Sequence, residues 1–344
     1  MTRSNPIFAV LRDPATAPSL SGPDWNRLIR YGRREFLLGT VGARTAGQRI
    51  PDRARIILDE ALETNILKQR QIRFEVERVA AALHGTGIPV LLMKGAAYLL
   101  ADLPPLPGRH IGDLDIMVPE DRLAEAESTL KAAGWRSVKS AGSYDDDYYR
   151  QWMHELPPLA HETRGHVVDL HHNILPRTAR LTPDSRRMLE QAVPVGNDLY
   201  VMGPEDMLLH AAAHLAYDGD FAGGARNLWD IDRLTRYFSK DDGFWQRLLS
   251  RAEAQQLSGP LRRALGLASD LYSTPLSPSV QRNVDLIDRL ALRKLRYRDR
   301  FGDSVTPLSD FLLFCRGHWL RMPPLMLTRH LLTKWQARRR EAQG

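Results

Sequence analysis

The sequence of 344 residues is long enough for two domains of ordinary size, and its 43% hydrophobic and 26% charged residues are typical of a soluble globular protein. No uncharged apolar run of about 18 residues predicts a transmembrane helix, and no apolar run after Met1–Arg3 predicts a secretory signal. Cys315 is the only cysteine, which excludes an internal disulfide, and we expect a cytoplasmic protein.

The formal charge of +7 and the isoelectric point near 9.6 come mostly from the carboxy-terminal part of the chain. Basic residues concentrate in LRKLRYRDR at 292–300 and in KWQARRR at 334–340. This pattern is compatible with a solvated helix face followed by a basic tail. It is equally a possible contact region for an anionic partner, namely nucleic acid, a membrane surface or an acidic peptide.

The amino-terminal part of the chain is predicted to be helical. Apolar residues between 51 and 84 recur at helical spacing, with Arg, Glu and Gln between them, and Gly85 and Gly87 end the pattern. The preceding segment DWNRLIRYGRREFLL also has a helical pattern.

The central part is predicted to hold a small sheet, over about residues 88–175. IPVLLM and DLDIMV are short apolar runs that predict buried strands, and LPPLAHE and HVVDLHHNI flank a turn and predict a hairpin. Helices are expected behind Gly95 and from Pro119 to Gly134.

Almost everything after Pro204 has a helical pattern. We therefore predict an α+β protein, with a small mixed sheet flanked by helical regions on both sides. The predicted boundaries are an N-terminal helical region at 1–87, a core at 88–200, and a C-terminal helical domain with a basic tail at 201–344.

Two aspartates in the second predicted strand point to a metal site. Asp113 and Asp115 share one face of a strand because side chains alternate, so their carboxylates repel unless a cation lies between them. A divalent ion with a preference for oxygen ligands, usually Mg²⁺, would resolve this conflict. The alternative is a strand end at which both acids meet water.

Three neighbouring features favour the metal interpretation. Gly112 lets the backbone approach a ligand, and Lys94–Gly95 lie at a strand-to-helix turn that suits a phosphate. Asp169 belongs to another predicted strand, and a third carboxylate there would complete a site for two metal ions.

Together these motifs resemble a known family. The segments LLMKGAAYLL, GRHIGDLDIMVP, AAGW and HVVDLHHNI are similar to the uncharacterised nucleotidyltransferase family of the DNA polymerase β-like superfamily, and the similarity continues weakly through PEDMLLHAAAHLAY and LWDID. It covers most of residues 50–235. The chain has Lys94–Gly95 where the superfamily usually has glycine–serine.

The resemblance implies a Mg-dependent nucleotidyltransferase core. Asp113, Asp115 and Asp169 would be catalytic and would bind two Mg²⁺ ions, or Mn²⁺, with Asp169 also a candidate base. Lys94, Gly95, Arg109 and Gly112 would bind the phosphates of a nucleoside triphosphate. The alternatives for Arg109 are neutralisation of the carboxylates or a position in solvent, and the alternative for Lys94 is an ion pair with an aspartate.

Four further groups have more than one interpretation. His171 shares the strand face of Asp169 and is either an accessory group or a hydrogen-bonded neighbour. His210 and His214 have zinc-like spacing but no third ligand in the sequence, so we favour a structural role. Asp230 is expected in a cap or a salt bridge. SYDDDYY is expected to be a solvated, mobile loop.

The predicted function is transfer of a nucleoside monophosphate, or a related phosphoryl-linked group, from an NTP to an unidentified acceptor, which could be a peptide, a protein, RNA or a small molecule. One alternative is a non-catalytic binding module for RNA or an acidic peptide. Another is a transferase on the same fold that uses a nucleotide sugar or modifies a phosphopeptide.

Overall fold

The computed structural model describes residues 4–217, 221–299, 301–323 and 326–328. Its helices are α1 Ile7–Arg12, α2 Gly22–Arg34, α3 Leu38–Arg44, α4 Asp52–Leu83, α5 Lys94–Leu100, α6 Leu123–Ala132, α7 Tyr144–Trp152, α8 Ser185–Glu190, α9 Pro204–Tyr217, α10 Gly224–Phe238, α11 Phe244–Ala254, α12 Ser258–Tyr272, α13 Leu286–Arg296 and α14 Pro307–Arg321, with 3-10 turns at Pro14–Ser19 and Glu120–Arg122. Its strands are β1 Val90–Leu92, β2 Leu114–Met117, β3 Trp135–Ser137, β4 Leu159–His161, β5 Val167–His171, β6 Val193–Gly196 and β7 Leu199–Val201.

The seven strands form one mixed sheet in the order β3-β4-β5-β2-β1-β7-β6. Strands β2 and β5 are parallel, as are β1 and β7, whereas the other neighbours are antiparallel. The central strands β1 and β2 are buried along their whole length, as expected for short apolar runs covered on both faces. The α+β class predicted from the sequence is confirmed.

The sheet extends beyond the predicted range. The hairpin predicted at 156–174 is present as β4 and β5, but β6 and β7 add a second hairpin after residue 175. Its turn has Asn197 and Asp198 with positive φ, the backbone conformation that Asn and Asp tolerate best after glycine. The sequence analysis missed this pair because β6 is largely exposed and lacks an apolar run.

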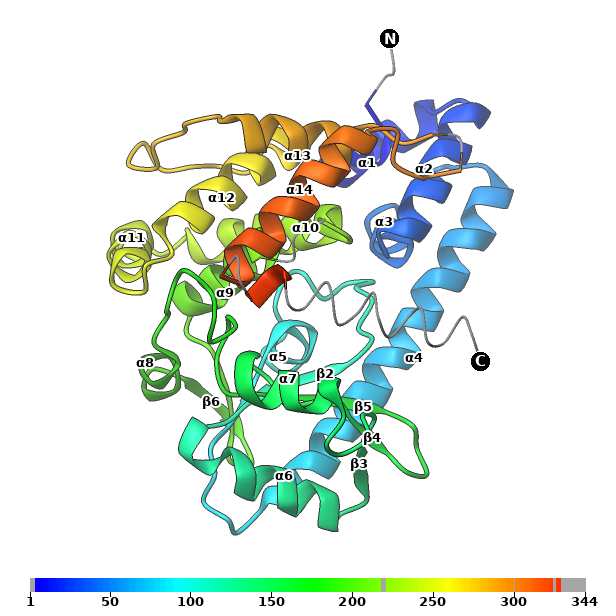
Figure 1. Ribbon diagram of the computed structural model, residues 1–344. Helices are drawn as coiled ribbons and strands as arrows, with labels where there is room; N and C mark the ends of the chain where they lie inside the picture. Colours follow the sequence, from blue (N-terminus) through cyan, green and yellow to red (C-terminus); the bar gives the residue numbers. More distant parts are fainter. Residues whose placement is uncertain (1–3, 218–220, 300, 324–325, 329–344) are drawn as a thin grey trace, which may run out of the picture.

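Helices α1 to α3 and α10 to α14 gather in the upper part of the molecule in Figure 1, whereas the sheet lies in the lower part together with α5, α6, α7 and α8. Helix α4, with 32 residues and a length of roughly 48 Å, runs along both parts and packs against α3, α5, α6 and β2. It corresponds closely to the predicted helix at 51–84. Within the described residues, no helix has the length and apolarity needed to cross a membrane.

The segment SYDDDYY was predicted to be a mobile loop. This prediction was wrong, because the segment forms the start of helix α7. The hydroxyl of Ser143 accepts the backbone N–H of Asp146 at 3.2 Å and caps the helix. Three successive aspartates fill the first turn, where the positive end of the helix dipole favours them. Asp146 is buried and accepts a hydrogen bond from Arg150 at 3.1 Å.

The loop between α5 and β2 is fixed to the helical part of the molecule. The Asn65 amide donates to the Gly108 carbonyl at 2.8 Å, and the Gln69 amide donates to the Arg109 carbonyl at 2.9 Å. Gly108 has φ +69°, and a Cβ there would overlap the backbone of Gly39 in α3. These contacts from α3 and α4 set the position of Arg109 and of the strand that follows.

Candidate active site

Three carboxylates meet at the ends of two parallel strands. Asp115 of β2 pairs in register with Asp169 of β5, and Asp113 lies one residue before β2 begins. Carboxylate oxygens of the three residues lie within 4.8 Å of one another. The structure therefore brings together the three acids that the sequence analysis singled out, although Asp113 is exposed and Asp115 is buried.

Asp115 is neutralised by protein groups. The Lys94 ammonium lies 2.6 Å from its Oδ1, and His171 Nε2 lies 3.2 Å from the same oxygen. Burial alone would raise the pKa of Asp115, but the charge of Lys94 and the hydrogen bond with His171 outweigh it and hold the pKa well below its usual range. Lys94 thus pairs with an aspartate, one of its two predicted roles.

Asp169 is in the opposite situation. Burial raises its pKa to about 7, and the charges of Asp115, Glu155 and Asp113 act in the same direction. Its Oδ1 atom is buried and has no hydrogen-bond partner among the described residues. An unpaired buried oxygen beside two further carboxylates is a donor set that fits a hard divalent cation.

A second group of potential metal ligands adjoins the first. Ligand atoms of His154, Glu155 and His171 lie within 4.8 Å of one another, and Glu155 Oε2 is 3.3 Å from His171 Nε2. Sequence analysis missed His154 and Glu155 because they lie in an irregular segment between α7 and β4. An isolated β-bridge between Glu155 and His171 brings this segment to the sheet.

Arg109 lies in a cavity of about 200 Å³ that Asp113, Asp115 and Lys94 also line. Its guanidinium donates to both oxygens of Asp230 at 2.8–3.1 Å and to the His110 carbonyl at 3.1 Å, and it lies 5.1 Å from the Tyr98 ring. Both members of the Arg109–Asp230 pair are almost fully buried. Asp230 therefore forms the salt bridge expected from the sequence, and Arg109 does not lie in solvent.

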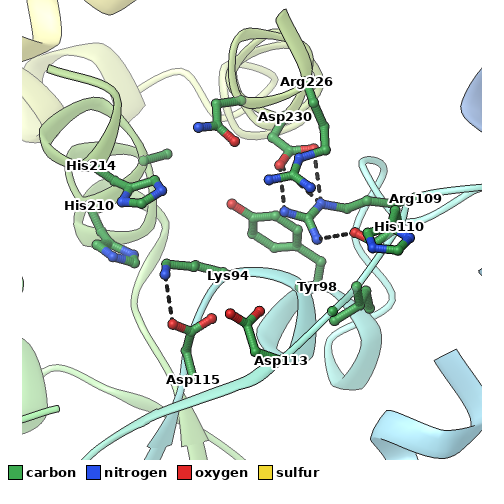
Figure 2. Close-up of a pocket in the computed structure, with 15 residues that line it drawn as sticks. Lys94, Tyr98, Arg109, His110, Asp113, Asp115, His210, His214, Arg226 and Asp230 are labelled. Atoms are coloured by element: carbon green, nitrogen blue, oxygen red, sulfur yellow. Dashed lines mark hydrogen bonds and ion pairs between the residues drawn. The ribbon is translucent and has the colours of Figure 1, made fainter. Parts of the chain in front are cut away.

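Helices α9 and α10 supply the remaining wall of this cavity, as Figure 2 shows. His210 and His214 extend from α9, and Arg226, Asn227 and Asp230 come from α10. Burial lowers the pKa of His210 to about 3, and the Lys94 charge adds to this shift, so the ring is neutral. Neither histidine belongs to a cluster of three or more potential ligands among the residues that the structure describes.

The two glycines predicted to contact phosphate have different surroundings. A Cβ on Gly95 would lie 2.5 Å from Arg109 Nη1 and 2.9 Å from Ile111, so this position requires glycine for packing. A Cβ on Gly112 would meet only the His110 ring, at 3.7 Å. The basic tail at 334–340 lies outside the described residues.

The chain is similar to known proteins at the level of a family model and of a solved structure. The model of a family described as "Uncharacterised nucleotidyltransferase" matches residues 21–273. A crystal structure of an antigenic nucleotidyltransferase-like protein from Paracoccidioides brasiliensis is similar at 16% sequence identity and a TM-score of 0.30, over 56% of this chain and 92% of that chain. No curated protein matches.

Proposed function

This chain belongs to the uncharacterised nucleotidyltransferase family, and we propose that it transfers a nucleoside monophosphate, or a related phosphoryl-linked group, from an NTP to an acceptor. One observation carries this proposal: carboxylate oxygens of Asp113, Asp115 and Asp169 lie within 4.8 Å of one another. The proposed acceptor class is open and includes peptide, protein, RNA and small molecules.

The three carboxylates would hold Mg²⁺, or Mn²⁺, and two ions would match the predicted two-metal arrangement. When bound, these ions supply positive charge to the phosphate oxygens and lower the pKa of an attacking hydroxyl. The unpaired Oδ1 of Asp169 supports this assignment because a buried carboxylate oxygen without a partner is costly.

In the proposed reaction, an oxygen of the acceptor bonds to the α-phosphorus of the NTP, and the bond from that phosphorus to the bridging oxygen breaks. Pyrophosphate leaves, and the acceptor proton passes to a base, for which Asp169 is the candidate. Lys94 lies beside Asp115 and is positioned to contact a phosphate as a point charge. Phosphate contacts from Gly95, Arg109 and Gly112 stay predictions.

The proposal is tested with NTPs labelled at the α- or the γ-phosphate, supplied with Mg²⁺ and with protein, RNA or small-molecule fractions as acceptors. We expect the α-label and not the γ-label to appear on an acceptor. Asp113→Asn should reduce this transfer about a thousandfold, since a metal ion contributes several kcal/mol to the transition state.

Asp113 suits this test because it is exposed and makes no hydrogen bond or ion pair with any residue that the structure describes. The exposed Asp121, changed to Asn, is the matched control and should leave transfer unchanged. Equal transfer by wild type and Asp113→Asn would contradict the proposal. Binding of RNA without label transfer would favour the binding-module alternative.

A further inference from the structure

The cavity beside the carboxylates contains a cation that the sequence analysis did not single out. Arg226 lies in the first turn of α10, more than a hundred residues after Asp113, yet both line the same cavity. In Figure 2, Arg226 lies beside Asp230 on the wall that faces Asp113 and Asp115. Lys94 lies between the two walls.

The guanidinium of Arg226 is not engaged in an ion pair in the part of the chain that the structure describes. It makes no hydrogen bond or ion pair with any described residue, and its Nε is buried without a partner. Burial lowers the pKa of Arg226, and the neighbouring charge of Arg109 lowers it further. A partly buried cation that forms no ion pair is less favourable than a paired one, and a ligand could supply the missing negative charge.

The charged groups of the cavity leave two members unpaired. Lys94 pairs with Asp115 and Arg109 pairs with Asp230, which leaves Asp113 and Arg226. The charges of Asp230, Glu35 and Asp113 act in the opposite direction to burial and raise the pKa of Arg226, but none of the three forms an ion pair with it. A ligand that carries a cation at one end and anionic oxygens at the other would satisfy both Asp113 and Arg226.

Arg226 is also held in a defined position. Its guanidinium carbon lies 5.6 Å from the centroid of the Phe36 ring, within the range of a cation–π contact. Phe36 stacks on His110, with ring centroids 4.8 Å apart and planes at 21°. Restricting the side chain in this way reduces the entropy lost when it binds a ligand.

We propose that Arg226 binds the polyphosphate of the NTP, on the phosphates that leave as pyrophosphate. This inference rests on the proposed function and goes beyond it by assigning a phosphate-binding residue on α10. A planar guanidinium with free N–H groups suits phosphate oxygens because it donates two parallel hydrogen bonds. All three nitrogens of Arg109 already donate to Asp230 or to the His110 carbonyl, whereas Arg226 donates to no described residue, so Arg226 is the better candidate.

The test measures equilibrium binding without turnover. Wild type, Arg226→Gln and Arg226→Lys are titrated by calorimetry with α,β-methylene NTP analogues of all four bases and with the corresponding NMPs, in the presence of Mg²⁺. We expect Arg226→Gln to weaken triphosphate binding roughly 10- to 100-fold, the range for hydrogen bonds to a charged group, and to change NMP binding less than threefold. The triphosphate affinity of Arg226→Lys should lie between those of wild type and Arg226→Gln.

Arg186→Gln is the matched control, because the Arg186 side chain is 88% exposed on α8 and the substitution removes the same charge. Equal triphosphate binding by wild type and Arg226→Gln would overturn the role of Arg226 alone. Failure of wild type to bind any triphosphate analogue would overturn the proposed function as well. If Arg226→Gln does not fold, unchanged triphosphate affinity of Arg226→Lys overturns the inference.

Discussion

Each wall of the cavity combines a charge that the protein neutralises with a charge that forms no ion pair among the described residues. The second charge is negative on one wall and positive on the other. On the sheet wall, Asp113 and Asp115 line the cavity and Asp169 lies next to them. Lys94 neutralises Asp115, whereas Asp113 and Asp169 form no ion pair with a described residue. On the helical wall, formed by Arg109, Arg226 and Asp230, Arg109 is neutralised by Asp230, whereas Arg226 forms no ion pair with the residues that the structure describes. The difference teaches which charges hold the fold together and which are available to a ligand.

The largest effect is expected at Asp169, one of the charges that are available to a ligand. Asp169→Asn should reduce transfer about a thousandfold, because it removes a proposed metal ligand and the candidate base. It should also stabilise the metal-free protein at pH 8, since the folded pKa of about 7 lies above the unfolded value of about 3.9. That difference lowers stability progressively between pH 4 and pH 7, by up to about 4 kcal/mol.

Urea unfolding of wild type and Asp169→Asn at pH 4 and pH 8 measures the stability change. The two proteins should differ most at pH 8 and much less at pH 4, where the folded carboxyl is protonated and the unfolded one is about half ionised. If the variant is less stable than wild type at pH 8, the ionised carboxylate stabilises the folded state. Asp169 would then not count as a charge that is available to a ligand.

The second prediction separates the two arginines of the helical wall. Arg109→Ala should lower the free energy of unfolding by about 3–5 kcal/mol, because it leaves the buried Asp230 carboxylate without a partner. Arg226→Ala breaks no hydrogen bond or ion pair of the described residues, so its effect should stay below about 1 kcal/mol. Urea denaturation measures both, and similar losses would break the distinction between the arginines.

The sheet wall could be predicted from the sequence because its geometry is local. An extended segment would place the side chains at 113 and 115 on one face, although β2 begins only at Leu114, and Asp169 follows two valines that predict a second strand. Their meeting still required that β2 and β5 lie side by side, which the family resemblance implied and the register Asp115 to Asp169 provides.

The helical wall could not be predicted in this way. Whether Arg226 faces a cavity or solvent depends on how α10 packs, and its helical pattern does not specify that. The Arg109–Asp230 pair joins residues 121 positions apart, and nothing in either local segment selects the partner. Glu155 was missed for a related reason, since a single β-bridge in an irregular segment positions it.

The third prediction concerns the histidines that line the cavity between the walls. His210 has a folded pKa of about 3, lowered from 6.5 first by burial and then by the Lys94 charge. Between pH 6.5 and pH 3, His210 therefore binds a proton in the unfolded state but not in the folded state. Stability from this group is fully present above pH 6.5 and is lost as pH falls toward 3, by up to about 1.4 kcal/mol per pH unit.

His210→Asn should therefore reduce the dependence of the unfolding free energy on pH between 6 and 4, measured by urea denaturation at several pH values. His84→Asn is the control, because the His84 side chain is 81% exposed. Parallel curves for wild type and His210→Asn would show that His210 is not held neutral. The helical wall would then accept an additional positive charge, contrary to the proposed charges of the two walls.

The smallest effects are expected at the two glycines next to the sheet wall. Gly95→Ala should destabilise the protein by about 1–3 kcal/mol, because its Cβ would displace Arg109 and Ile111 from their packed positions. Gly112→Ala has room for the methyl group and should change stability by less than about 0.5 kcal/mol.

Thermal unfolding measures the stability of these variants, and calorimetric titration with an NTP analogue and Mg²⁺ measures their ligand binding separately. If Gly112→Ala leaves stability unchanged but weakens binding, the backbone at 112 approaches the ligand as the sequence predicted. If both properties are unchanged, the role predicted for Gly112 is wrong.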